Sequence, residues 1–145
     1  VVRARRPMGS ELRGWVGDAD VYEREGWNEA AVKAGMKKLP EKLQEAGYYT
    51  VHAGKWHLGL ARQAFTPVGR GFNESLAMLM GSEQHFTQRN GLGARTQHVD
   101  LWASDRPALE QNGTYSANLF GGYGARVLRR HIASNRQQGR SRIHI

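Results

Sequence analysis

Two side chains that can carry a positive charge, Lys55 and His57, are separated by one residue in the run Ala53-Gly54-Lys55-Trp56-His57-Leu58-Gly59. The run follows an apparent strand, and in open α/β sheets the carboxyl ends of strands border the crevice where ligands bind. A lysine keeps its charge near neutral pH, whereas a histidine exchanges its proton there. Such a pair suits an anionic group whose ester bond is to be broken. The structural alternative is that Lys55 is a solvated surface charge and His57 a hydrogen-bonded loop histidine.

Hydrophobic spacing predicts the elements that would position this pair. A helix is expected before it, because apolar residues recur at helical spacing: Met36, Leu39, Leu43 and Ala46. Pro40 is tolerated in a first turn, and Gly47 suits a left-handed stop. Tyr48 to Ala53 is rich in aromatic and β-branched residues and predicts a strand. A helix, a glycine and a strand form half of a crossover unit, so a parallel sheet is expected.

The rest of the chain alternates loops with short apolar segments. Residues 59–71 and 81–100 are predicted loops, and Ser75 to Met80 fits a buried strand or a helical turn equally well. Val99 to Trp102 and Asn112 to Thr114 predict two small strands joined by a turn. A second helix is predicted from Ser116, a possible N-cap, to Ile132. Its apolar side would carry Leu119, Phe120, Tyr123, Val127 and Leu128.

Three blocks in order resemble the arylsulfatase family, and most closely its arylsulfatase B-like branch. They are Leu39-Pro40-Glu41-Lys42-Leu43-Gln44-Glu45-Ala46-Gly47-Tyr48, Gly54-Lys55-Trp56-His57-Leu58-Gly59 and Thr66-Pro67-Val68-Gly69-Arg70-Gly71-Phe72. The later pieces Val99-Asp100-Leu101-Trp102, Asp105-Arg106-Pro107 and Asn112-Gly113-Thr114-Tyr115-Ser116 resemble the same branch. The resemblance covers residues 35–131.

The resemblance implies an α/β fold, namely part of the alkaline phosphatase-like or sulfatase fold, with a mainly parallel sheet flanked by helices. It implies hydrolysis of sulfate esters with Ca²⁺ and formylglycine. Lys55 would then bind a sulfate oxygen. His57 would be a catalytic and substrate-binding residue, hydrogen-bonded to the formylglycine or to the sulfate. The expected partner is a sulfated small molecule or a sulfated glycan.

Two parts of the family pattern are missing. Sulfatases form formylglycine in a C/S-x-P-x-R motif, but this chain has no Cys and no Ser-x-Pro-x-Arg. The family's paired aspartates for the metal are also missing, because Asp18 and Asp20 are not adjacent. We therefore expect an internal piece of a catalytic domain that is inactive alone, with no metal ligands of its own. Residues 1–35 would be an irregular basic segment, 36–132 a partial sulfatase domain and 133–145 a polar basic tail.

Other residues receive weaker predictions. Trp56 is expected to pack, Arg70 to pin a loop and His85 to be a loop histidine, and Ser82 to Gln88 would be a substrate-side loop. Asn73 and Asn112 begin glycosylation sequons, which agree with a secreted, lysosomal or periplasmic parent enzyme. No signal peptide or membrane-spanning run is visible.

The net charge of +8 and the pI near 10.3 raise the question of a nucleic-acid partner. Much of the excess lies in Arg3 to Arg13 and Arg126 to Arg142, and no aromatic residue is interleaved there for base stacking. We therefore expect no nucleic acid as partner. Two other functions stay open: hydrolysis of phosphate esters within the same superfamily, and non-catalytic binding of polyanions through the basic ends.

Overall fold

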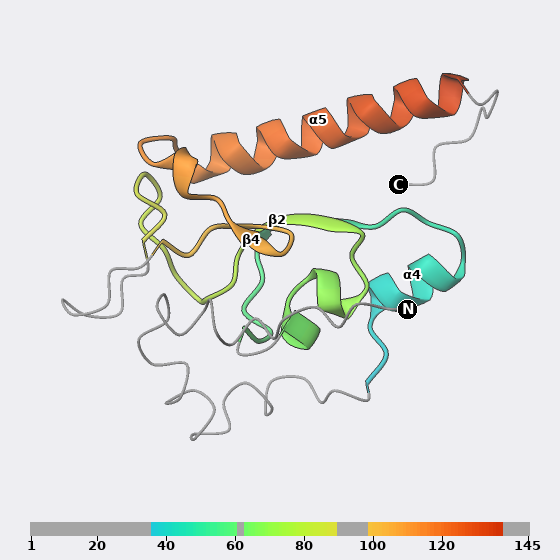
Figure 1. Cartoon of the computed structure of the whole chain (residues 1–145), viewed down its shortest axis with the longest axis horizontal. Coiled ribbons are helices and arrows are strands. Elements are labelled where there is room, and N and C mark those ends of the chain that lie inside the picture. The colour runs from blue at the N-terminus through green and yellow to red at the C-terminus, as the bar shows by residue number, and fades with distance from the viewer. Residues whose placement is uncertain (1–35, 61–62, 90–98, 138–145) are drawn as a thin grey trace, which may run out of the picture.

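The computed structural model describes residues 36–60, 63–89 and 99–137. They form an α/β arrangement in which one long helix lies across one face of a four-stranded sheet (Figure 1). This confirms the expected fold class. The helices and strands are α4 (Leu39–Glu45), β1 (Val51–Lys55), β2 (Glu74–Met78), β3 (Trp102–Ala103), β4 (Arg106–Pro107) and α5 (Ser116–Gln137). The shorter 3-10 turns are η1 (Gln63–Phe65), η2 (Val68–Arg70) and η3 (Leu109–Gln111).

The sheet has the strand order β1-β2-β3-β4. β1 and β2 are parallel, with Val51 opposite Glu74 and Lys55 opposite Met78. This pair is the parallel pairing expected from the sequence. β2 with β3 and β3 with β4 are antiparallel, so the described sheet is mixed.

The strand that carries the candidate site is shifted along the sequence relative to the prediction. The prediction ended at Ala53, but β1 runs from Val51 to Lys55. Gly54, with a φ of +122°, does not end the strand, because pairing with β2 continues to Lys55. Before the strand, Thr50 is bound to Asn73: the Thr50 N–H donates to Asn73 Oδ1 at 2.8 Å, and the Thr50 carbonyl accepts the Asn73 N–H at 2.8 Å.

The first helix is shorter than predicted, and its apolar face is different. α4 begins at Leu39 with Pro40 in its first turn, and it ends before Gly47, whose φ is +86°. Met36 and Leu39 are 57% and 69% exposed, so their predicted inward placement is wrong. Pro40, which is buried, anchors the helix, and Glu41 packs so closely on Gly71 that a Cβ atom there would lie 2.6 Å from the Glu41 backbone N.

The predicted pair of small strands is only partly correct. Trp102–Ala103 does form β3, but its partner is Arg106–Pro107 rather than Asn112 to Thr114. Ser104 and Asp105 make the turn between them, and Ser104 adopts a φ of +57°. Asn112 and Gly113 lie in a turn instead, with Gly113 at a φ of +89°, because a glycine tolerates the left-handed conformation that this turn requires.

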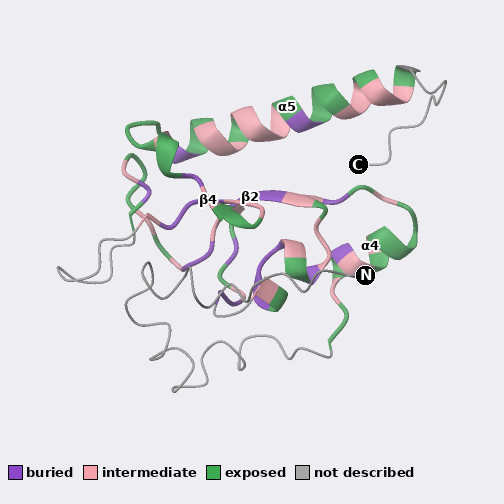
Figure 2. Cartoon of the chain, viewed as in Figure 1, coloured by how far each residue is buried: buried purple, intermediate pink, exposed green. Residues whose placement is uncertain are grey.

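β2 is the centre of the core and is buried on both faces (Figure 2). Ala77 packs in one cluster with Trp56, Leu60, Leu79, Met80 and Trp102. Leu76 packs in the other with Leu101 and Ala108, covered by Leu119, Phe120 and Tyr123 of α5. Because successive strand residues point to opposite faces, β2 joins the two clusters.

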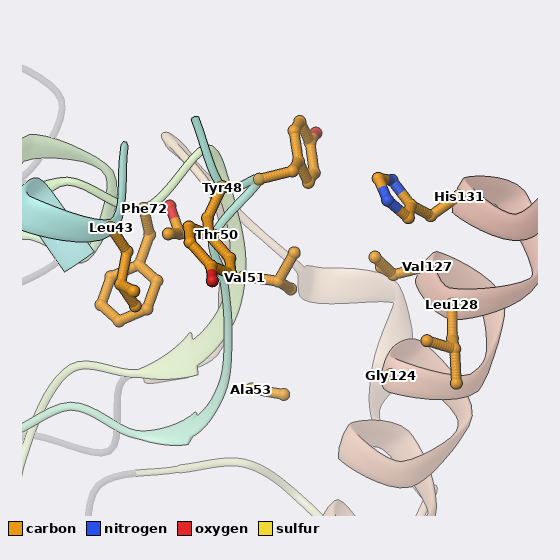
Figure 3. A pocket seen from close by; sticks show the side chains of 11 residues that line it. Leu43, Tyr48, Thr50, Val51, Ala53, Phe72, Gly124, Val127, Leu128 and His131 are labelled. Carbon is orange, nitrogen blue, oxygen red and sulfur yellow. The ribbon is translucent and has the colours of Figure 1, made fainter. Parts of the chain in front are cut away.

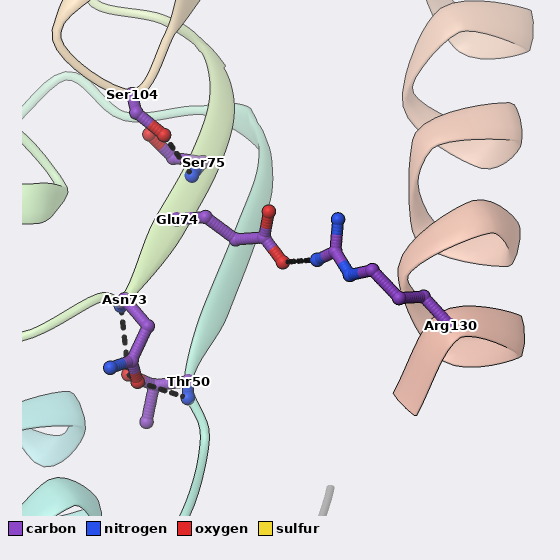
Figure 4. A network of polar contacts seen from close by, with 6 residues as sticks. All are labelled: Thr50, Asn73, Glu74, Ser75, Ser104 and Arg130. Atoms are coloured by element: carbon purple, nitrogen blue, oxygen red, sulfur yellow. Dashed lines mark hydrogen bonds and ion pairs between the residues drawn. The ribbon is translucent and has the colours of Figure 1, made fainter. Parts of the chain in front are cut away.

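Helix α5 extends to Gln137, five residues beyond the predicted end at Ile132, and its apolar side faces the sheet as predicted. Polar contacts also tie the helix to the sheet. Arg130 forms an ion pair with Glu74 on β2, while Thr50 bonds Asn73 and Ser75 bonds Ser104 within the sheet (Figure 4). Burial, together with the nearby Glu74 carboxylate, raises the pKa of Tyr123.

A largely apolar cavity of about 390 Å³ runs along β1 between the α4 region and α5 (Figure 3). Leu43 and Phe72 line one side of it, and Val127, Leu128 and His131 line the other. Val51 and Ala53 of β1 lie between these two groups. Val51 lies opposite Glu74, which pairs with Arg130 of α5, so the cavity lies against the face of β1 that α5 covers.

Candidate functional site

Lys55 and His57 lie at the carboxyl end of β1. Lys55 is the last strand residue and His57 follows two residues later, and both side chains are exposed. The end of the parallel neighbour β2 lies beside them, because Lys55 pairs with Met78. The structure thus puts both predicted residues, exposed, at the carboxyl end of a parallel strand.

Trp56 fixes the backbone between these two residues. Its indole N–H is directed at two carbonyl oxygens, that of Phe65 at 2.8 Å and that of Gly59 at 3.1 Å. The side chain is 7% exposed and lies edge-on to the ring of Phe72. Trp56 therefore packs as predicted, and it leaves its two neighbours little freedom to shift along the strand.

His57 has a backbone conformation that the sequence pattern did not predict. Its φ is +52°, in the left-handed region that non-glycine residues rarely adopt. Its N–H donates to the carbonyl of Leu79 at 3.1 Å. The imidazole lies directly over Gly81, where a Cβ atom would be 2.8 Å from both Cε1 and Nε2 of the ring. Strand alternation stops before His57, and the exit of β2 sets the position of its ring.

A buried carboxylate, Asp100, lies at this exit. Its Oδ2 accepts the N–H of Met80 at 2.8 Å and its Oδ1 accepts that of Leu79 at 3.1 Å. Burial raises the pKa of Asp100 to about 7, although the two amide hydrogen bonds act in the opposite direction. Sequence analysis missed Asp100, because its partners are twenty residues away and no local pattern marks them.

The loop between β2 and β3 holds a second, half-buried acid. Ser116 Oγ lies 2.6 Å from Oε1 of Glu83 and 2.9 Å from the carbonyl oxygen of His85. Burial raises the pKa of Glu83, against the opposing Ser116 hydrogen bond and the nearby His85. The N-cap prediction for Ser116 is therefore wrong: Ser116 is the first residue of α5, and its hydroxyl faces the loop.

Buried Gln88 connects this loop to Asp100. Its side-chain NH₂ donates to the backbone carbonyls of Thr114 at 2.6 Å and His85 at 3.2 Å. The backbone carbonyl of Gln88 accepts the N–H of Asp100 at 2.7 Å. Gln88 is 1% exposed and has a φ of +52°. His85 lies in the loop as expected, with its ring exposed beside Tyr115.

Arg70 is buried within the loop that follows β1. It is 3% exposed, and its guanidinium lies 5.9 Å from the ring centroid of Phe65. Burial and the nearby Arg70 lower the pKa of Lys38, whose ammonium lies 5.9 Å from the ring centroid of Trp56. The burial of Arg70 supports its predicted role of pinning this loop.

Other predicted features are only partly within the described residues. The basic run Arg3 to Arg13 and the end of the second run lie outside them. Asn112 lies in an exposed turn, and Asn73 accepts hydrogen bonds from Thr50, while glycosylation stays a prediction. Across the described ranges no cluster of three or more His, Cys, Asp or Glu could hold a metal ion. The described helices include none that is long and apolar enough to span a membrane.

Comparison with curated proteins finds sulfatases. An uncharacterized sulfatase, PB10D8.02c of Schizosaccharomyces pombe, is 57% identical over 53 residues, which are 37% of this chain and 9% of that protein. Arylsulfatase J of Mus musculus is 37% identical over 83 residues, 57% of this chain and 14% of that protein. An arylsulfatase of Klebsiella aerogenes is 46% identical over 55 residues, 38% of this chain and 12% of that protein. No family model matches the chain.

Among solved structures, the crystal structure of Ps i-CgsB is similar in fold, with a TM-score of 0.58 and 22% identity. The match covers 69% of this chain and 24% of that one. The chain thus spans 9% to 14% of the length of the three curated relatives. The sequence matches confirm the resemblance to sulfatases, and the described elements are consistent with part of a sulfatase fold.

Proposed function

We propose that this sulfatase-related chain supplies the anion-binding strand end of a sulfuric ester hydrolase, in which Lys55 and His57 hold the sulfate group. The observation that carries the proposal is their joint exposure at the carboxyl end of a parallel strand, on either side of the locked Trp56. The strained backbone of His57 supports it, because such conformations cluster at functional sites.

The two side chains would have different tasks. The Lys55 ammonium is a compact charge with three donors, suited to a sulfate oxygen on which negative charge grows as the ester bond breaks. The His57 imidazole can donate a hydrogen bond to the same group or pass a proton at the ester oxygen. Because the His57 ring is seated on Gly81, it would meet the substrate in a fixed position.

The nucleophile and the metal of this chemistry are not placed on the described residues. The chain contains no Cys that could become formylglycine, and the described acids and histidines do not fit a metal site. We therefore assign no step to either group, and we expect this chain by itself to bind sulfate without turning over an ester. The substrate class would be aryl sulfates or sulfated sugars, met in a secreted, lysosomal or periplasmic setting.

Titration of the 145-residue chain with inorganic sulfate tests the binding part of the proposal. Lys55→Ala is expected to weaken sulfate binding about tenfold, since a hydrogen bond to a charged group contributes about 1.5–3 kcal/mol and solvent reduces that value at an exposed site. Lys42→Ala is the matched control, because it removes an exposed lysine of α4 and should leave the affinity unchanged. Equal affinities for wild type and Lys55→Ala would contradict the assignment of Lys55.

The same titration with inorganic phosphate addresses the competing phosphatase hypothesis. Sulfate should bind more tightly than phosphate if the site belongs to a sulfatase. Preference for phosphate would reverse our ranking of the two reactions. Loss of binding only when residues 1–35 and 138–145 are removed, with Lys55→Ala unchanged, would instead favour the basic ends as a polyanion-binding surface.

A further inference from the structure

Asp100 is a buried acid whose carboxylate is directed at the backbone rather than at solvent. It is 6% exposed, and its two oxygens accept the consecutive N–H groups of Leu79 and Met80 at 3.1 and 2.8 Å. These are the first two residues after β2 ends at Met78. Burial of a carboxylate costs free energy unless hydrogen bonds offset it. The Leu79 and Met80 amides supply these bonds, so Asp100 holds the chain at the point where it leaves β2.

The segment that Asp100 holds is the one on which His57 rests. Leu79 gives its N–H to Asp100 and takes the N–H of His57 at its carbonyl, 3.1 Å away. Two residues further on, Gly81 lies under the His57 ring so closely that no side chain fits between them. Both the backbone and the imidazole of His57 are thus located by residues 79–81.

Asp100 is itself held from the other side. Its N–H donates to the carbonyl of Gln88 at 2.7 Å, and the Gln88 side-chain amide is bound to the carbonyl of Thr114 at 2.6 Å. A continuous set of hydrogen bonds therefore runs from the start of α5 to the end of β2. These hydrogen bonds are buried, where each is stronger than in water, and they favour a single geometry of the three segments.

We propose that Asp100 is a positioning residue for His57, holding residues 79–81 so that the imidazole stays at the sulfate-binding strand end. Its consequence for sulfate rests on the function proposed above, whereas its consequence for the His57 ring does not. Asp100 acts through the backbone amides of Leu79 and Met80 and through Gly81, not by direct contact with the sulfate group.

The test compares Asp100→Asn with wild type in the full 145-residue chain by ¹H–¹³C NMR. Asn has nearly the shape of Asp, but its NH₂ cannot accept, so one of the two amides loses its partner. The Cε1–H signal of His57, assigned by its loss in His57→Gln, is expected to shift. The signal of His131 on α5, whose ring stacks on that of Tyr49, should stay in place. Asp105→Asn, at the exposed turn between β3 and β4, is the matched control and should move neither signal.

Inorganic sulfate is then titrated into the same samples. Displacement of His57 should weaken sulfate binding about three- to tenfold in Asp100→Asn, a loss on the scale of one weakened hydrogen bond to a charged group. If wild type binds no sulfate but His57 still shifts in Asp100→Asn, the proposed function fails while the positioning role stands. If wild type binds sulfate and Asp100→Asn changes neither the His57 signal nor the affinity, the positioning role is overturned and the proposed function stands.

A measurement on wild type covers the case in which Asp100→Asn does not fold. Scalar couplings across the hydrogen bonds from the Leu79 and Met80 amide nitrogens to the Asp100 carboxyl carbon should be detectable. A nuclear Overhauser contact between the Gly81 Hα atoms and the His57 ring should accompany them. Absence of these couplings or of that contact would overturn the proposal.

Discussion

His57 is held in a strained conformation by several independent contacts. A non-glycine residue at a φ of +52° costs on the order of 1 kcal/mol or more, and it persists only where the surroundings impose it. Here the Leu79 carbonyl, the Gly81 surface and the anchored Trp56 all impose it. The strain places an imidazole where strand alternation would not, beside the exit of the neighbouring strand.

Asp100 should make stability depend on pH in an unusual direction. The folded chain keeps the Asp100 proton up to about pH 7, whereas the unfolded chain releases it near pH 3.8. Between these values the folded state binds more protons, so the Asp100 contribution to stability falls as pH rises from about 4 to about 7. Burial raises the pKa of Glu83 as well, which acts in the same direction.

Thermal unfolding midpoints of wild type and Asp100→Asn, measured at several pH values, isolate this contribution. Burial lowers the pKa of His52, which gives an opposing slope in acid that both proteins share. The melting temperature of wild type relative to that of Asp100→Asn is therefore expected to fall from pH 4 to pH 7. A difference that is constant or rises over this range would show that the Asp100 pKa is not raised.

At the residue scale, sequence reasoning identified Lys55 and His57 and missed what positions them. A short motif after an apolar strand is a local signal, and it located the two side chains correctly at the strand end. The contacts of Asp100 with residues 79 and 80, and of Gly81 with His57, join segments about twenty residues apart. Neither has a periodicity that a single sequence could reveal.

Helix α5 contains a glycine that the packing does not require. Gly121 is exposed, and a Cβ atom there would have no neighbour within 4 Å. Gly121→Ala should raise the free energy of unfolding by about 0.5–1 kcal/mol, because alanine loses less backbone entropy in a helix. Denaturant unfolding followed by circular dichroism would measure the change.

Gly71→Ala provides the contrast. Gly71 has a φ of +92°, and a Cβ atom there would lie 2.6 Å from the backbone N of Glu41, so this variant should be destabilised. If Gly121→Ala lowered stability as well, α5 could not be the regular helix described.

At the scale of elements, hydrophobic periodicity predicted the long, well-buried helix correctly and failed for the short helix and the short strand. The long α5 has an apolar side that packs on Leu76 and Leu101, as its spacing predicted. The two-turn α4 was given the wrong face, because Pro40 and the contact of Glu41 with Gly71 seat it instead of Met36 and Leu39. The β4 strand has only two residues, which is too short for alternation to show.

The whole described molecule is organised around β2, while β1 is at the edge of the sheet. Among the described strands, β1 pairs with β2 alone, and a largely apolar cavity of about 390 Å³ lies between β1 and α5. An unpaired edge with apolar surroundings is a place where a strand can add. On the described strands alone, β1 is therefore the edge at which the sheet could continue.

Amide hydrogen exchange resolved by residue tests whether this edge is open. The Trp56 N–H donates to Met78 on β2, and backbone groups alternate in direction along a strand. The amides of His52 and Gly54 should therefore point toward β2, while those of Val51, Ala53 and Lys55 point away from it. We expect the second group to exchange much faster than the first, by about tenfold or more, because a protected amide must wait for local opening. Equal protection of both groups would mean that another segment pairs with β1, and the sheet would then be more complete than its described strands.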